Sequence, residues 1–557
     1  MINLPPAAIF ILGAFLIPFL KGRAKQAYLL LIPVIAFTDL IYMQEGMHFV
    51  YKFLDYNLIF ARVDKLSMVF GYVFVIMAFA GILYALHVKN DGEHMASFFY
   101  IGSSLGAVFA GDLFTLFIFW EIMAFSSVFL IWYQKEKAAL DAGFRYILVH
   151  IFGGLCLLGG IILHLANTGS IEFGLTEYGS LASYLILIGF ILNAAVPPLS
   201  AWLSDAYPEA TVTGAVFLTA YTTKTAVYVL ARAFPGVEIL VWLGAVMAVY
   251  GVIYAVLEND IRRLLAYHII SQVGYMVAGV GIGTTLAING SSAHAFCHIL
   301  YKALLFMGAG AVIYMTGKRK LTELGGVYKT MPITLILYMV GGFSISAVPL
   351  FSGFVSKSMV VAASAESHLS LAWLMLVLAS SGTFLHTGLK LPYFTFFAKD
   401  SGIRAKEPPL NMLLGMGFLA FLCIFIGVYP AVLYNILPYP AEFVPYTGQH
   451  ISETLQILLF TALGFFLLLR HLAGTPTISL DTDWFYRKGA KAFVWFINNP
   501  IANFSKLTEK IFFDKIPSSL ARFVRYPGEV ERRSPVGTAV LLATIFLLIY
   551  FIIFIRR

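Results

Sequence analysis

The sequence is poor in charged residues and has no long polar stretch. Of its 557 residues only 12% are charged, whereas 60% are hydrophobic, and the mean hydropathy is +0.85. Soluble globular proteins carry about 25% charged residues, so this composition excludes an ordinary soluble protein. Apolar runs of about 20 residues recur along nearly the whole chain and leave no stretch for a soluble catalytic domain. The composition therefore predicts an all-α, polytopic membrane protein.

Cysteine is also scarce. Cys156, Cys297 and Cys423 lie singly inside apolar runs, and no C-x-x-C pair occurs. This spacing excludes an iron–sulfur cluster or a zinc ribbon built by this chain alone. We therefore expect no cofactor and no catalytic or redox site in the chain, and any electron transfer would take place in partner chains.

The basic residues do not form a patch for nucleic acid. The net charge of +8 is spread over short loops between hydrophobic runs, a distribution that the positive-inside rule explains. The N-terminus lacks the basic n-region of a signal peptide, and Lys21, Arg23 and Lys25 follow its apolar run instead, which predicts a retained first helix with its N-terminus outside. We expect the cell membrane as the location and the lipid bilayer as the surroundings.

Hydropathy predicts about sixteen spans. Their expected centres are residues 12, 35, 75, 102, 122, 154, 190, 222, 248, 272, 300, 340, 378, 422, 460 and 545. Loops 318–320 and 399–406 are rich in Lys and Arg and are predicted to be cytoplasmic, whereas loops 167–177, 283–292 and 438–450 contain neither residue and are predicted to be external. Residues 47–62 are too polar to span and partly alternate, which indicates a hairpin on the outer face.

The spans group into six expected segments. These are N-terminal spans with the outer hairpin (1–110), a first repeat core (111–235), a second repeat core (236–400), C-terminal core spans (401–475), a membrane-surface segment (476–534) and a final span (535–557). Aromatic and basic residues interrupted by Asn499-Pro500 are typical of helices that lie along the membrane surface.

Two of the predicted spans are interrupted in the same way. AVPPLSAWLSD (195–205) and AVPLFSGFVSK (347–357) share Ala, Val, Pro and two Ser, with Trp202 and Phe354 at equivalent positions. Pro197 and Pro198 open the first helix by removing N–H donors. Interrupted segments at corresponding positions of two halves indicate the ion site of a transporter. We therefore expect two repeated bundles, each with one broken helix.

Ionisable residues occur near the middle of several spans, where a charge costs at least about 2.5 kcal/mol. Glu121 lies at the centre of its span, where desolvation favours a neutral carboxyl group that can relay protons. Lys224 lies in the middle of the next apolar run after the first break. Lys357 closes the second broken helix as Asp205 closes the first.

A stripe of three further residues lies in AHAFCHILYKALLF. His294, His298 and Lys302 are spaced at i, i+4 and i+8 and share one helix face. A proton wire is favoured over a structural polar stripe or a metal site, because a lysine next to the histidines repels a cation and no third ligand is evident. Lys390 lies near a cytoplasmic end and is expected to snorkel to the surface.

At these residues the chain resembles a known family. FWE (119–121), PPLSAWLSDA (197–206), NDIRRLLAYHIISQVGYM (259–276), HILYKALLF (298–306) and PLFSGFVSK (349–357) are similar to motifs of the antiporter-like subunits shared by respiratory complex I, Mrp Na+/H+ antiporters (Mrp D-like) and membrane-bound hydrogenase or sulfur-reductase-type complexes. The resemblance covers roughly residues 60–440. It implies a fourteen-helix core with two inverted five-helix repeats and discontinuous helices 7 and 12.

The resemblance also assigns roles by position. Glu121, Lys224, the stripe of His294, His298 and Lys302, and Lys357 match the family's proton relay. Asp260 and Arg262 match the charged start of helix 10 and, with Asp205, are possible supporting residues. One position departs, because Asn193 stands where the family usually has a lysine that pairs with the glutamate.

These features predict a proton- or sodium/proton-translocating subunit of a multi-subunit membrane complex. Its expected partners are other antiporter-like and small membrane subunits, and soluble redox subunits of a hydrogenase, sulfur-reductase or quinone-reductase type. Two alternatives stay open. A structural scaffold with an impaired ion path is favoured by Asn193, and an independent secondary transporter is disfavoured because the polar residues form a line rather than a pocket.

Overall fold

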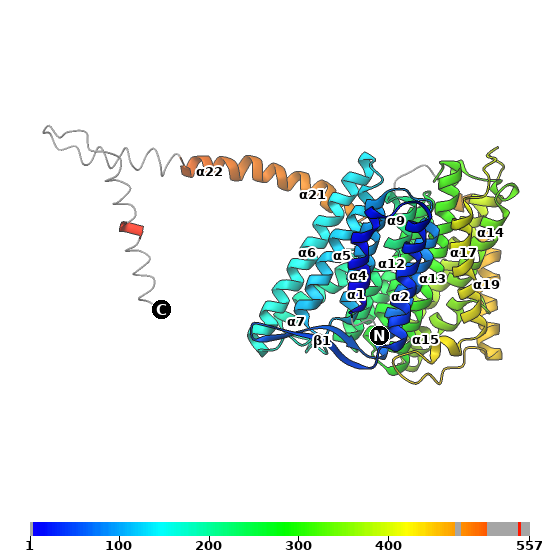
Figure 1. Cartoon of the computed structure of the whole chain (residues 1–557). Coiled ribbons are helices and arrows are strands. Elements are labelled where there is room, and N and C mark those ends of the chain that lie inside the picture. Colours follow the sequence, from blue (N-terminus) through cyan, green and yellow to red (C-terminus); the bar gives the residue numbers. More distant parts are fainter. Residues whose placement is uncertain (1–3, 474–480, 510–543, 547–557) are drawn as a thin grey trace, which may run out of the picture. The chain divides into compact units, whose positions relative to one another are not determined.

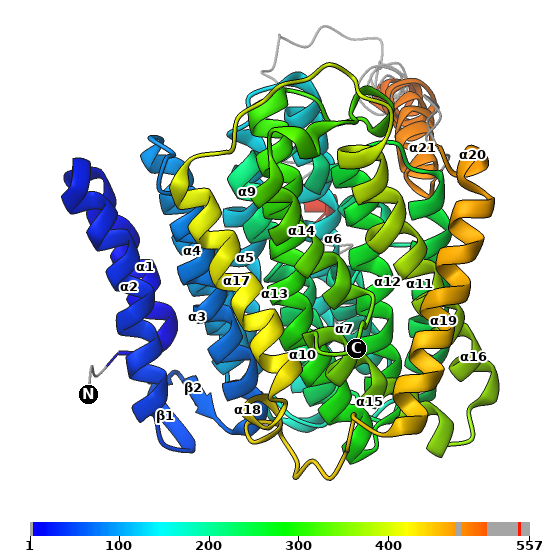
Figure 2. The same ribbon diagram turned by 90° about the vertical axis from the view of Figure 1, so that its right-hand side faces the viewer.

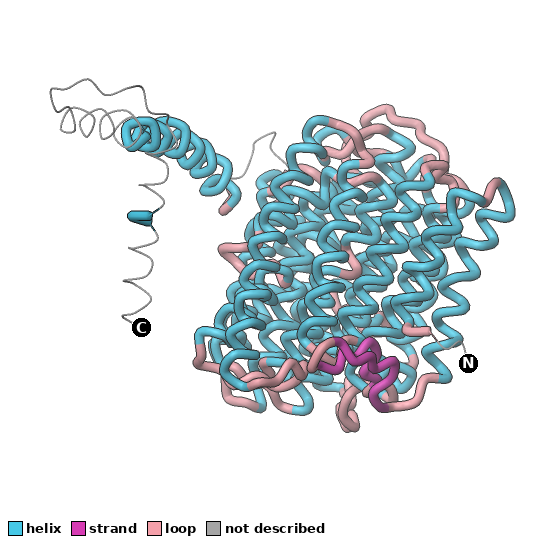
Figure 3. The backbone as a smooth tube through the Cα atoms, turned by 60° about the vertical axis from the view of Figure 1, so that its left-hand side comes forward, coloured by secondary structure: helices cyan, strands magenta, loops and turns pink. Residues whose placement is uncertain are grey.

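The computed structural model describes residues 4–473, 481–509 and 544–546. The chain divides into two compact units, Met1–Asp483 and Trp484–Arg557. The first unit is a bundle of helices that run side by side, as Figures 1 and 3 show. This unit holds every residue that the sequence assigns to the ion path.

Ten helices of the described residues are long and apolar enough to cross a membrane. They are α2 (Gly22–Tyr42), α3 (Lys65–Ala85), α5 (Leu113–Trp132), α6 (Lys137–Thr168), α11 (Glu238–Leu257), α12 (Ile261–Ile282), α13 (Thr285–Thr316), the run Ser370–Phe397 that starts with α16 (Ser370–Thr383), α17 (Leu410–Val428) and α19 (Gly448–Leu467). Shorter apolar helices are α1 (Pro6–Leu16), α7 (Leu181–Asn193) and α14 (Pro332–Ile345), and α4 (Asp91–Phe109) has polar residues in its first turn. The predicted all-α membrane fold is confirmed, and the predicted centres from residue 12 to residue 460 all fall inside helices.

α12 and α13 form the middle of the bundle. In the apolar stretch of each of these helices 94% of the residues are buried, compared with 11% in α19. α12 and α13 are therefore surrounded by protein, whereas α19 lies at the edge. Figure 2 shows this order, with α1 and α2 on one side of the bundle and α16 and α19 on the other. The polar stripe of the sequence therefore lies on the most enclosed helix, α13.

The predicted hairpin is present. β1 (Gly46–Phe53) pairs antiparallel with β2 (Tyr56–Val63), in a register that places Gly46 opposite Val63 and Phe53 opposite Tyr56. Its second strand is tied to the bundle, because the Ile59 N–H donates to Asp112 Oδ2 at 2.7 Å and Arg62 Nη1 donates to the Phe173 carbonyl at 2.6 Å. The hairpin covers one end of the helices (Figure 3).

The two interrupted spans have the same backbone geometry. α7 continues after its break as α8 (Ala201–Ala206), and α14 continues as α15 (Ser352–Glu366). Ala195 and Ala347, at equivalent repeat positions, have φ angles of 58° and 57°. The next residue in each repeat donates its N–H five residues back, Val196 to Ile191 and Val348 to Phe343, both at 3.1 Å. Both predicted breaks are confirmed, whereas the inverted relation of two five-helix repeats stays a prediction.

A third break was not predicted. α9 (Val212–Leu218) and α10 (Thr222–Ala233) are separated at Thr219–Tyr221, which ends three positions before Lys224. This segment contains no proline or glycine, so the sequence carries no local signal for the interruption.

The C-terminal helices are α21 (Asp483–Phe496) and α22 (Ala502–Glu509). The regular α-helix is interrupted at Pro500, where a wider π-helical turn, Ile497–Ile501, contains the proline and joins the two helices. Such a turn accommodates the missing N–H that would break a regular α-helix. The predicted final span, 535–557, lies outside the described residues except for 544–546.

Candidate functional site

Lys224 lies directly after the unpredicted third break. Its side chain is fully buried, and its ammonium group donates to the Thr219 carbonyl oxygen at 2.5 Å and to Thr223 Oγ1 at 3.1 Å. The carbonyl belongs to the residue where α9 ends. The break therefore supplies a polar backbone partner that a continuous helix would keep for its own hydrogen bonds.

Lys357 has the same kind of environment at the second predicted break. It is 2% exposed, and its ammonium group donates to the Ile345 carbonyl oxygen at 2.8 Å, at the end of α14. The Tyr275 ring on α12 lies 5.3 Å from the nitrogen, which adds a cation–π contact. Two buried lysines thus each bind a carbonyl group that a helix break exposes.

The α13 stripe connects these two positions. His294, His298 and Lys302 are all fully buried. His294 Nδ1 lies 3.3 Å from Ser356 Oγ on α15, next to Lys357. Among the described residues, both ring nitrogens of His298 and the ammonium group of Lys302 have no hydrogen-bond partner. Buried polar atoms are nearly always hydrogen-bonded, so these atoms predict ordered water in the interior.

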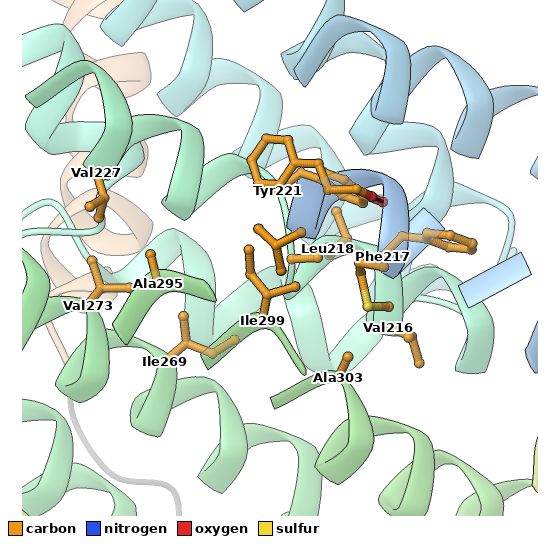
Figure 4. Close-up of a cluster of buried hydrophobic side chains, with 14 of the residues drawn as sticks. Val216, Phe217, Leu218, Tyr221, Val227, Ile269, Val273, Ala295, Ile299 and Ala303 are labelled. Carbon is orange, nitrogen blue, oxygen red and sulfur yellow. Dashed lines mark hydrogen bonds between the residues drawn. The ribbon is translucent and has the colours of Figure 1, made fainter. Parts of the chain in front are cut away.

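The lysines are close enough to influence one another. The charges of Lys224, Lys302 and Lys357 all act on His298, which places groups from α10, α13 and α15 in one electrostatic network. Apolar side chains fill the space between the helices of this network. Figure 4 shows Leu218 and Tyr221 beside Ile299, and Val273 beside Ala295, between the helices that carry the polar residues. Apolar surroundings of this kind strengthen electrostatic interactions within the network, because the local dielectric constant is low.

Glu121 is not part of this cluster. Its side chain is half-buried on α5, against Gly154 of α6, where a methyl group would overlap Glu121 Oε1. Among the described residues Oε1 has no hydrogen-bond partner. The structure therefore brings together Lys224, the α13 stripe and Lys357, and it leaves Glu121 on a separate helix pair.

Asn193 contacts a histidine that the sequence analysis did not single out. Asn193 Oδ1 lies 2.9 Å from His150 Nδ1 on α6, and the His150 ring lies 4.1 Å from Tyr146 and 4.6 Å from Trp202. His150 is 1% exposed. Its position in the middle of the apolar α6 run was the available signal. At the site of the expected lysine the chain thus has a neutral amide bonded to an imidazole.

The possible supporting residues stabilise the ends of helices. Asp205 forms a two-bond pair with Arg145, at 2.7 Å and 3.0 Å. Asp260 caps α12 by accepting the N–H groups of Arg262 and Arg263 and also pairs with Arg319. Arg262 donates to the Ala210 carbonyl at 2.8 Å. These contacts explain the three residues as structural anchors.

Two further residues differ from what the sequence alone indicates. The expectation that Lys390 snorkels is wrong, because it is 1% exposed and its ammonium group donates to the carbonyls of Val256 and Glu258 at 2.5 Å and 3.1 Å. The carbonyls at the end of α11 offer a nearer partner than water.

Asp481, far along the chain, is buried at 5% exposure and accepts hydrogen bonds from Ser204, Tyr250 and Tyr267 on three core helices.

A cavity of about 750 Å³ lies beside Lys357. Its lining includes Ser346 and Lys357 near the second break, and Thr447, His450 and Glu453 at the start of α19. The His450 ring stacks on Phe354 at 4.4 Å. The cavity extends from Lys357 to residues of loop 438–450, the loop that the sequence predicts to be external. The described residues contain no group of three or more metal-binding side chains.

A helical membrane bundle with broken helices and buried lysines is the structure expected of an antiporter-like membrane subunit. Residues 110–385 match the family model described as NADH:quinone oxidoreductase/Mrp antiporter, transmembrane region. The match assigns this central region, just under half of the chain, to that family. The matched segment contains Glu121, both predicted breaks and all three clustered lysines.

Curated proteins of similar sequence include two antiporter subunits. The chain is 29% identical over 376 residues to the uncharacterized protein MJ1309 of Methanocaldococcus jannaschii, covering 63% of this chain and 77% of that protein. It is 28% identical over 507 residues to a Na+/H+ antiporter subunit of Alkalihalophilus pseudofirmus, and 30% identical over 401 residues to a probable K+/H+ antiporter subunit of Rhizobium meliloti. These matches cover 79% and 66% of this chain, and it spans 62% and 40% of the two antiporter subunits.

Solved structures show the same fold. A chain of the membrane-bound sulfane sulfur reductase, an archaeal respiratory membrane complex, superimposes with a TM-score of 0.74 at 24% identity, covering 98% of this chain and 99% of that one. A chain of the Mrp complex from Dietzia sp. DQ12-45-1b gives a TM-score of 0.68 at 20% identity, covering 81% and 99%. A chain of respiratory complex I from Thermus thermophilus gives 0.67 at 20%, covering 78% and 99%. All three are chains of multi-subunit membrane complexes.

Proposed function

We propose that this chain is a proton- or sodium/proton-translocating subunit of a multi-subunit complex in the cell membrane. The observation that carries the proposal is the pair of lysines at helix breaks. Lys224 and Lys357 each bind a backbone carbonyl at a break, and His298 and Lys302 lie in the electrostatic network between them. A cluster of lysines that has no carboxylate partner among the described residues is costly in a membrane interior, so function is its best explanation.

The arrangement suggests how a charge is passed on. Each broken helix lets its lysine exchange a carbonyl partner for water, and a lysine that loses its proton lowers the repulsion felt by the next one. Two unit charges 4 Å apart interact by about 4 kcal/mol at an effective dielectric constant of 20, and by less at greater separation. Protonation of one lysine therefore disfavours protonation of its neighbour, which moves protons stepwise along α13.

The cavity beside Lys357 supports an outward route. It joins the ammonium group of Lys357 to Thr447 and His450 of the loop predicted to be external. An ion that leaves the α13 stripe at Lys357 would reach the outer side through this volume. Lys224 lies at the opposite end of the line, after the break between α9 and α10.

The proposal includes partners. The sequence offers no motif for a redox centre, so we expect energy to come from other subunits, such as soluble redox subunits or those that carry an opposing ion gradient. The outward faces of α6 and α19 carry large exposed apolar side chains, among them Leu148, Phe152, Leu155, Leu459 and Phe460, which suit lipid or small and antiporter-like membrane subunits.

A structural scaffold with an impaired ion path is the second candidate. Asn193 favours it, because its amide is hydrogen-bonded to His150 and, unlike a lysine, cannot exchange a proton with Glu121. The intact cluster around Lys302 argues against it. One measurement distinguishes the two candidates, namely the rate of ion translocation by a variant in which a lysine of the cluster is replaced.

Lys302→Ala tests the proposal in sealed, inverted membrane vesicles that contain the intact complex, with translocation followed by a fluorescent ΔpH dye during turnover. We expect translocation to fall by at least about tenfold, equivalent to about 1.4 kcal/mol. The partner's own chemistry should continue. Lys318→Ala, at an exposed loop position, is the matched control. Wild-type translocation by Lys302→Ala would support the scaffold instead.

A further inference from the structure

A second line of polar residues leaves the relay along α12. Tyr275, Gln272 and His268 are spaced at i, i−3 and i−7 and so lie on one face of the helix. Tyr275 lies under the ammonium group of Lys357, and its ring is 5.8 Å from that of His294. From this position the face leads toward the start of α12, where Arg262 and Arg263 mark the predicted cytoplasmic end.

Gln272 forms the first link. Its Nε2 donates to Thr383 Oγ1 at 3.2 Å, at the end of α16. Its Oε1 is buried and has no hydrogen-bond partner among the described residues. Thr387, one turn further along, is also fully buried with a hydroxyl that lacks a partner in the described chain. Polar atoms of this kind predict ordered water between α12 and the segment after α16.

Two histidines follow toward the cytoplasmic end. His268 on α12 is fully buried, and the structure gives neither of its ring nitrogens a hydrogen-bond partner within the described residues. The ring of His386 lies 6.1 Å away, and its Nδ1 is also without such a partner. His386 belongs to a π-helical turn, Phe384–Lys390. Turns of this type occur often at functional sites because they change the direction of side chains.

The line ends at Lys390. Its ammonium group binds the carbonyls of Val256 and Glu258 at the end of α11, and the Glu258 carboxylate lies 3.1 Å from Arg263. The charged groups that face the histidines are therefore Lys302 on α13, Lys357 on α15 and Lys390 on the π-helical turn, with Glu258 beyond. The charges of Lys302 and Lys357 both act on His268, so the protonation of His268 is electrostatically coupled to the relay.

We propose that His268 and His386 form a proton branch that joins the relay at Tyr275 and Lys357 to the cytoplasmic side at Lys390. An imidazole accepts a proton at one nitrogen and releases one from the other, so two neighbouring rings, with three nitrogens that lack a partner among the described residues, pass protons through intervening water. A purely structural pair would use the three nitrogens that lack a partner among the described residues for packing hydrogen bonds. The branch rests on the proposed function and gives the second half of the bundle its own supply of protons from the cytoplasmic side.

The test uses His268→Gln, His386→Gln and the double variant in the intact complex, with His164→Gln, a half-buried histidine near the outer end of α6, as the matched control. We expect each single variant to slow translocation by about fivefold or more and the double variant to be no slower than the slower single one, because both residues serve one path. The solvent isotope effect in D2O should rise in both single variants. A packing defect would not change it.

Assembly is checked on native gels. If the glutamine variants do not assemble, His386→Ala with imidazole added on the cytoplasmic side takes their place, and restored translocation is expected. Wild-type rates and isotope effects in assembled glutamine variants, or no imidazole rescue in assembled His386→Ala, would overturn the branch. Lys302→Ala, measured in parallel, separates the two ideas: if it stops translocation while the histidine variants do not, only the branch fails.

Discussion

Gly353→Ala should damage the second helix break and, with it, the position of Lys357. Gly353 is the second residue of α15, and a methyl group there would overlap the carbonyl oxygen of Ser344 at the end of α14. The obstacle is backbone, so no side chain can move aside. The equivalent residue of the first repeat is already alanine, Ala201, so the two breaks differ in this requirement.

The magnitude follows from two losses. Overpacking of a rigid contact costs about 1–3 kcal/mol. Displacement of α14 from α15 also weakens the 2.8 Å bond from Lys357 to the Ile345 carbonyl, and a hydrogen bond from a charged group contributes about 1.5–3 kcal/mol. The sum of about 3 kcal/mol or more predicts a clear fall in the thermal unfolding midpoint.

The assay compares Gly353→Ala with Gly417→Ala, because Gly417 lies in a helix with open space where its methyl group would be. Thermal unfolding of the purified complex and translocation in vesicles are measured for both. Gly353→Ala should lose at least about tenfold in translocation at a temperature where it remains assembled, corresponding to about 1.4 kcal/mol. Equal behaviour of the two variants would refute the assigned geometry of the break.

Three further predictions follow from named contacts. Glu121→Gln should impair translocation less than Lys357→Ala, since Glu121 is half-buried and outside the lysine cluster; the opposite order in vesicle assays would show that Glu121 controls the path. Asp481→Asn should lower the unfolding midpoint by an amount equivalent to about 1–3 kcal/mol, because three hydroxyl groups donate to this carboxylate; an unchanged midpoint in calorimetry would contradict it. Lys390→Met should destabilise the end of α11 by leaving two buried carbonyls unpaired, which hydrogen exchange of residues 250–258 measures; unchanged protection would mean that water replaces the ammonium group.

The sequence by itself determined the class of protein and the location of its unusual residues. Long apolar runs, the hairpin at 47–62 and the paired AVP motifs predicted helices, strands and breaks that the structure contains. These features are local. The cost of placing a lysine in an apolar run, or a proline in a helix, depends on the residue and its neighbours and is visible without a fold.

Only the tertiary structure decided which polar groups meet. It paired Lys224 and Lys357 with carbonyls at breaks, turned Asn193 toward His150, buried Lys390 and brought His268 within 6.1 Å of His386, which is 118 positions later in the chain. Each of these contacts depends on how helices rotate and pack, and many similar rotations satisfy the same hydrophobic pattern. The break at Thr219–Tyr221 is of the same kind, because it lacks proline and glycine and its groups bond to other helices: Tyr221 donates to the Phe74 carbonyl at 3.1 Å, and the Thr222 N–H donates to Tyr100 Oη at 3.0 Å.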